Sequence, residues 1–235
     1  DASAETLLLE DDKDLAFTRE VNERYGSSDF LVLTYSPYED LLADSTLDSL
    51  RELSAELLTL DRVESIDSIL NVPLLESPPK PIKELIKNVP TLESPGIDKA
   101  LAKKEFLNSP IYSDNLVSPD FKTTALLINL HDDPLYRELL QQRNSLRKKE
   151  KEETLSVIEQ IELKKVLVDF KNHRDKMRLV EHKNISQVRA IADKYRGDAK
   201  IFLGGASMVA DDLITFISSD LQVFGSAVLV FLMLT

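Results

Sequence analysis

The stretch Thr123-Thr124-Ala125-Leu126-Leu127-Ile128-Asn129-Leu130 decides how this chain folds. Apolar and β-branched side chains fill most of its positions, which is typical of a buried β-strand. Phe30-Leu31-Val32-Leu33-Thr34-Tyr35 has the same character, and weaker strand patterns span residues 63–70 and 200–203. The sequence therefore predicts four strands, two of them strongly.

Helical patterns separate these strands. Apolar side chains at helical spacing predict helices over residues 47–60 and 184–196. Ser45 stands three residues before Asp48, which predicts a capping box at the start of the first helix. The order of elements is βαββαβ, the split ferredoxin-like pattern. We therefore expect an α+β fold in which two helices cover one face of a four-stranded antiparallel sheet.

Two long insertions interrupt this pattern. Residues 71–122 lose helical and strand periodicity and contain Ser77-Pro78-Pro79-Lys80-Pro81, which must be extended because proline fixes its own φ and restricts its predecessor. We expect this Pro-rich insertion to lie outside the core, with short helices over 82–88 and 98–107. Another helix is expected near the start of the chain, over 11–25.

The second insertion, residues 131–180, is highly charged and helical. It contains no glycine, and Pro134 is its only proline. Charge runs of this kind usually form the solvated face of a helix. We expect a long helical arm here, either one protruding helix or a helical hairpin.

The composition excludes several classes of function. The chain has 235 residues, with 29 Lys and Arg against 41 Asp and Glu, and a formal net charge of -12. This acidity argues against nucleic acid as a partner, because phosphate binding needs a surplus of cations. The absence of cysteine excludes disulfides, thiolate metal sites and cysteine nucleophiles.

No catalytic constellation is found. His173 and His182 are nine residues apart, which does not bring two metal ligands to one helical face. We interpret His131-Asp132-Asp133 as a solvated turn and leave the role of Asp211-Asp212 open. Gly205-Ala206-Ser207-Met208-Val209 lacks the second glycine of a nucleophile elbow. We therefore expect no enzyme activity, no catalytic residue, no cofactor and no metal.

The C-terminal segment is uncharged. Asp220 is the last charged residue, and residues 221–235 are mostly apolar. A transmembrane helix needs about 20 apolar residues. We interpret 221–235 as the beginning of such a helix and 1–220 as a water-facing domain. The alternative is a buried C-terminal core helix.

Four segments together resemble the first extracytoplasmic loop of bacterial RND-superfamily transporters of the MMPL type. They are 1–15, which begins Asp1-Ala2-Ser3-Ala4-Glu5-Thr6-Leu7-Leu8-Leu9-Glu10; 25–32, with Tyr25-Gly26-Ser27 and Phe30-Leu31-Val32; 65–75, Ser65-Ile66-Asp67 to Pro73-Leu74-Leu75; and 202–225, with Phe202-Leu203-Gly204-Gly205 and Phe224-Gly225. The resemblance covers essentially the whole chain. It implies a ferredoxin-like porter domain that faces the periplasm or exterior and is attached to the cytoplasmic membrane.

The resemblance also implies a function. Such proteins export lipids or other hydrophobic compounds and are driven by proton flow, so the implied partners are the membrane, a second porter loop of the same polypeptide and a hydrophobic or lipid-like substrate. An oligomer is compatible with it. The proton-relay carboxylates of these transporters lie in membrane helices outside this chain, so no coupling residue is assigned here.

Gly204 and Gly205 are the candidate hinge between the porter domain and the membrane helix. The alternative is a plain tight turn. Two other classes of protein compete with the exporter. One is a membrane-anchored periplasmic binding or assembly module without transport activity, and the other is a soluble regulatory domain whose tail is a core helix.

Overall fold

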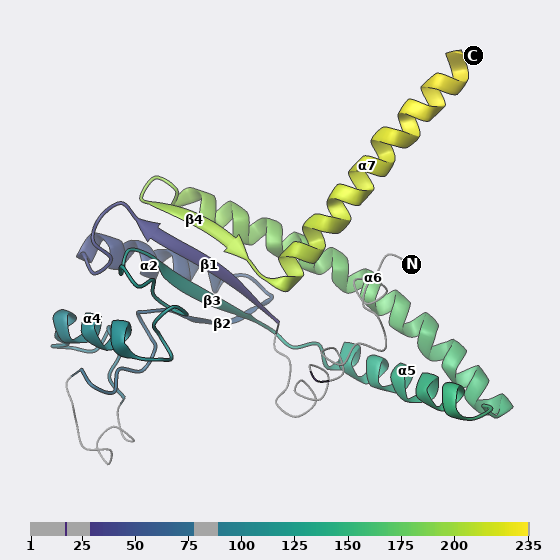
Figure 1. Ribbon diagram of the computed structural model, residues 1–235, viewed down its shortest axis with the longest axis horizontal. Coiled ribbons are helices and arrows are strands. Elements are labelled where there is room, and N and C mark those ends of the chain that lie inside the picture. The colour runs from purple at the N-terminus through teal and green to yellow at the C-terminus, as the bar shows by residue number, and fades with distance from the viewer. Residues whose placement is uncertain (1–16, 18–28, 78–88, 235) are drawn as a thin grey trace.

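The computed structural model describes residue 17, residues 29–77 and residues 89–234, with side chains described up to residue 226. Its centre is one four-stranded antiparallel sheet in the order β2-β3-β1-β4 (Figure 1). The strands are β1 (Phe30–Pro37), β2 (Val63–Asp67), β3 (Thr124–Leu130) and β4 (Ala199–Gly204). The predicted α+β class and the four strands are confirmed, with β2 shorter than expected.

The two strands with the strongest sequence signal lie side by side at the centre. Leu31 pairs with Ile128 and Leu33 with Leu126, and all four side chains are fully buried. Alternate residues of both strands therefore supply one apolar face, as the period of a strand requires. Helix α2 (Asp44–Leu57) packs its buried leucines into the same hydrophobic cluster.

The start of α2 differs from the prediction. The helix begins at Asp44, and Ala43 occupies the N-cap position without a side-chain hydrogen bond. Ser45 lies inside the first turn, where its hydroxyl donates to Glu39 instead of capping the helix. The predicted capping box is therefore wrong, because the helix begins one residue before Ser45.

The segment between β2 and β3 contributes to the core. It contains α4 (Lys99–Asn108), which confirms the helix expected over 98–107, whereas 82–88 and the prolines at 78, 79 and 81 lie outside the described residues. Phe106 is fully buried and lies in the main hydrophobic cluster, and the buried Glu105 carboxylate accepts from the Leu75 N–H at 2.5 Å. The expectation that residues 71–122 lie outside the core is therefore wrong.

The charged segment forms a helical hairpin. Its helices are α5 (Pro134–Glu152) and α6 (Val157–Lys194), which extend together away from the sheet (Figure 1). Tyr136 and Phe170 stack between them with ring centroids 5.3 Å apart. α6 then continues without a break into the core, where Val188 is fully buried. The separate helix predicted over 184–196 is thus the last part of α6.

Helix α7 (Ala206–Leu234) follows β4 and stands away from the sheet (Figure 1). Leu221, Val223 and Phe224 are 68%, 64% and 72% exposed, so the alternative of a buried core helix does not hold for these residues. Within the part of the chain that the structure describes, no helix is long and apolar enough to span a membrane. Most of 221–235 has side chains outside that part, as does the helix expected over 11–25 apart from residue 17.

We expect Ser156→Ala to lower the free energy of unfolding by about 1 kcal/mol, the usual contribution of an N-cap hydroxyl. Ser156 caps α6, and its backbone N–H donates to the Glu159 carboxylate at 2.9 Å. Urea denaturation followed by circular dichroism measures the change. Ser145→Ala, at an exposed position inside α5, is the matched control and should cost less. Equal effects of the two substitutions would contradict a stabilising role for this cap.

Candidate functional site

The base of α7 is the candidate functional site. A cavity of about 430 Å³ lies there, where the ends of the strands meet α5, α6 and the first turns of α7. Its polar lining includes Asp29, Arg62, Arg178, Glu181 and Ser207, which come from segments far apart in the sequence. Leu140, Met177, Ala210 and Ile214 supply an apolar wall.

The two predicted hinge glycines have different structural roles. Gly205 has a φ of +138°, and a Cβ added there would lie 3.0 Å from the Phe30 carbonyl oxygen and 3.1 Å from a methyl group of Leu31. Both the conformation and the contact with β1 therefore require glycine. Gly204 pairs with Val32 as the last residue of β4, and its added Cβ would make an ordinary 3.8 Å contact.

Two side-chain pairs, His182 with Asp211 and Arg189 with Asp212, join α7 to α6 just above this turn. The Asp211 carboxylate lies 2.9 Å and 3.0 Å from Nδ1 of His182, and Arg189 donates to both carboxylate oxygens of Asp212 at 2.9 Å. The acidic dipeptide whose role the sequence left open therefore orients the base of α7 against α6. Asp211 is the better protected member, with its side chain 11% exposed.

The strand-end segment His131-Asp132-Asp133 forms part of the cavity wall. Asp133 caps α5 by accepting from the Tyr136 N–H at 2.9 Å, and it lies 2.8 Å from Nε2 of His173. Asp132 pairs with Arg137. The side chain of Asp133 is 19% exposed, so the prediction of a solvated turn is wrong for this residue.

Two carboxyl groups in the cavity are energetically unfavourable in their charged form. Burial raises the pKa of Glu181, and the negative charges of Asp29, Asp133 and Asp211 raise it further, while Arg62 opposes them. Burial also raises the pKa of Asp29, against the attraction of Arg62. Within the described residues, the buried Arg62 Nε and Ser207 Oγ atoms have no hydrogen-bond partner. Such convergence of perturbed and unpaired groups is typical of a binding site.

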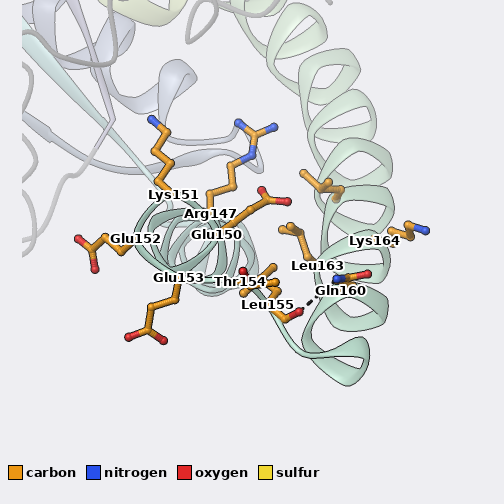
Figure 2. A pocket seen from close by; sticks show the side chains of 11 residues that line it. Arg147, Glu150, Lys151, Glu152, Glu153, Thr154, Leu155, Gln160, Leu163 and Lys164 are labelled. Atoms are coloured by element: carbon orange, nitrogen blue, oxygen red, sulfur yellow. Dashed lines mark hydrogen bonds between the residues drawn. The ribbon is translucent and has the colours of Figure 1, made fainter.

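A second hollow lies at the elbow of the arm. Its volume is about 740 Å³, and it is lined by the end of α5, the connecting residues and the start of α6. Figure 2 shows Leu163 directed toward α5 and Lys164 directed away from it, with charged side chains around the rim. The Leu155 carbonyl, which closes the elbow, accepts from Gln160 at 3.1 Å (Figure 2). Among the described residues, none that lines this hollow has a buried side-chain atom without a hydrogen-bond partner.

The described residues contain no group of three or more His, Asp or Glu side chains arranged to hold a metal ion. Comparison with family models, curated proteins and solved structures yields no match to this chain. The site therefore has to be interpreted from its own geometry. Sequence reasoning found Gly205 and the acidic pair at 211–212, but it missed Asp29, Arg62 and Glu181, which carry no local motif.

We expect Gly205→Ala to destabilise the chain by about 1–3 kcal/mol, because the new methyl group meets β1 and the backbone conformation is strained. Gly204→Ala is the matched control and should cost about 1 kcal/mol or less, since its Cβ has room. Thermal unfolding of both variants measures the difference. If Gly204→Ala were the more damaging of the two, the assigned roles of the glycines would be wrong.

We expect Glu181→Gln to raise the unfolding midpoint at pH 7. A carboxyl whose folded pKa is raised makes the folded state bind more protons, so its penalty is full above the folded pKa and disappears below the unfolded one. The difference from wild type should therefore shrink as the pH falls toward about 4. Glu162→Gln, at an exposed position of α6, is the control. A stabilisation that does not change with pH would contradict this explanation.

Proposed function

We propose that this chain is a porter-type extracytoplasmic domain of a bacterial RND-superfamily exporter of the MMPL type, and that α7 connects it to the membrane. One observation carries the proposal. α7 is held at its base by polar contacts and then exposes large apolar side chains, among them Val209 (51%), Phe216 (71%) and Phe224 (72%).

The exposed side chains of α7 follow helical spacing. Val209, Leu213 and Phe216 are four and three residues apart and therefore share one face. The opposite side contains Ser218 and Gln222, which line a shallow hollow against α6. A contiguous apolar face of this kind is unfavourable in water and is typical of contact with a membrane or with other helices.

The arrangement of the sheet supports a ferredoxin-like unit, which is the building block of RND porter domains. The strand order β2-β3-β1-β4 with all neighbours antiparallel agrees with that topology, and α2 and the last part of α6 pack into the hydrophobic cluster of the sheet. In this view, the Pro-rich segment after β2 and the arm after β3 are insertions into the unit, although the former also contributes core residues.

The proposed mechanism is transport by movement of domains. Proton flow through membrane helices outside this chain would tilt α7, and the pairs formed by Asp211 and Asp212 would transmit the tilt to α6. In this proposal Gly205, whose φ of +138° is readily adopted only by glycine, is the hinge between β4 and α7. A hydrophobic or lipid-like substrate would pass between this domain and a second porter loop. No residue described here has a catalytic role in this mechanism.

A membrane-anchored binding or assembly module is the second candidate. It is favoured by the outer face of the arm, where Val157, Ile158 and Ile161 are 73%, 77% and 64% exposed. Apolar side chains at the tip of a projecting hairpin suit contact with another protein. Such a module would share the membrane attachment but not the transport.

Export can be tested in cells that lack the gene and are complemented with the full-length gene product that contains this chain. We expect the deletion strain to retain a hydrophobic fluorescent dye, wild type to restore dye efflux, and a protonophore to abolish it. Asp211→Asn combined with Asp212→Asn should reduce efflux at unchanged protein level, because both contacts to α6 are weakened. Ser218→Ala, on the same helix, is the control.

The location of the domain can be tested in the same cells. Because the chain contains no cysteine, Ser145→Cys provides a labelling site without background from this domain. A membrane-impermeant maleimide should label it in intact cells. Labelling only after lysis would contradict the extracytoplasmic location, whereas labelling without proton-dependent efflux would favour the binding or assembly module.

A further inference from the structure

The cavity at the base of α7 contains polar groups that the protein itself leaves without partners. The Nε atom of Arg62 and the hydroxyl of Ser207 are buried there and have no hydrogen-bond partner within the described residues. Asp29, Arg178 and Glu181 also line the cavity, and the charge of Arg62 partly offsets the charges of Asp29 and Glu181. Buried polar atoms are paired in most proteins, so the two unpaired ones in this cavity, Arg62 Nε and Ser207 Oγ, need an explanation.

The other charged groups of the cavity are already paired. Asp132 pairs with Arg137, Asp133 pairs with His173, and Arg174 pairs with Asp175. These contacts fix the wall formed by α5 and α6. The groups left for a ligand are therefore two guanidinium groups, one hydroxyl and two carboxyl groups.

Both signs of charge are represented among these groups. An anion alone would be attracted by Arg62 and Arg178 but repelled by the two carboxylates. A cation alone would be attracted by the carboxylates but repelled by the two arginines. We propose that this cavity binds a small zwitterion, a ligand that carries an anionic group and an ammonium group. Its anionic oxygens accept from Arg62, Arg178 and Ser207, and its ammonium donates to Asp29 and Glu181.

Three further features agree with this assignment. The anionic group would lie near the first turn of α7, where the unpaired backbone N–H groups of a helix favour negative charge. Burial and neighbouring acids raise the pKa of Glu181, and an ammonium group beside it would offset that unfavourable charge. The volume of about 430 Å³ lies in the range of small-molecule sites.

The apolar wall suggests that the ligand also has a short nonpolar part. Met177, Ala210 and Ile214 line the cavity together with its charged groups. A phosphorylated amino alcohol has the required chemistry, and it occurs both as a free metabolite and as the headgroup of a lipid. This inference goes beyond the proposed export function and does not depend on it, because binding is measured on the isolated chain.

The test is calorimetric titration of the purified chain, kept in solution by a nonionic detergent, with O-phosphoethanolamine. We expect it to bind at least about tenfold more tightly than inorganic phosphate or ethanolamine, since each of these satisfies one half of the site. No binding of O-phosphoethanolamine would overturn the proposal. Equal affinity for inorganic phosphate would also overturn it and indicate a site for an anion alone.

Substitutions of two lining residues test whether the ligand binds in this cavity. Arg178→Gln and Glu181→Gln should each weaken binding by about tenfold or more, because each removes one charged contact. Arg178 is exposed and Glu181→Gln is expected to stabilise the fold, so both variants should remain folded. Lys171→Gln, exposed on α6 away from the cavity, is the matched control. Unchanged affinity in both cavity variants would overturn the assignment.

A short-chain lipid with the same headgroup, dihexanoyl phosphatidylethanolamine below its critical micelle concentration, identifies the source of the ligand. Tighter binding than O-phosphoethanolamine supports the zwitterion site with a lipid headgroup as its occupant, and weaker binding supports it with a free metabolite. Either result applies to this cavity only if Arg178→Gln and Glu181→Gln also weaken the binding of the lipid. Lipid binding that neither substitution changes would be association with the exposed face of α7 and would count against the proposal.

Discussion

The antiparallel pairing of β1 with β3 is the contact on which the rest of the structure depends. β1 pairs with β4 on its other side, and β3 pairs with β2, so removal of either central strand would separate the sheet into parts. Their buried side chains also form the surface on which α2 and the last part of α6 pack. The N-terminal end of β1 contacts Gly205 as well, so the same strand fixes where α7 leaves the domain.

The strands could be predicted because each is a short apolar run, and a buried strand needs little else. Helix boundaries were harder to predict. Residues 157–194 contain no glycine or proline, so nothing in the sequence ends a helix between the arm and the core. The buried face of this helix nevertheless contacts α5 in the arm and the hydrophobic cluster of the sheet near its C-terminal end. The segment after β2 was misjudged for a different reason. Phe121 enters the core from a turn, which leaves no periodic signal, and Phe106 enters it from α4, a helix that was predicted but was not expected to pack in the core.

The candidate site could be predicted only where its chemistry is local. Gly205 is part of a glycine pair after a strand, and 211–212 is an acidic dipeptide, so both were visible in the sequence. Arg62 and Glu181 are separated by more than half the chain and meet only because the start of β2 and the middle of α6 line the same cavity. The residues that flank Arg62 and Glu181 in the sequence do not show that the two side chains line one cavity.

The continuity of α6 has a mechanical consequence. A helix of 38 residues is about 57 Å long, and this one extends from the elbow of the hairpin to the hydrophobic core as a single stiff rod. A force applied at the elbow acts with a long lever arm, while the other end packs against α2 and the sheet. No flexible loop lies between the two ends to absorb the strain. A force on the tip of the hairpin is therefore transmitted through α6 to the packing of the sheet.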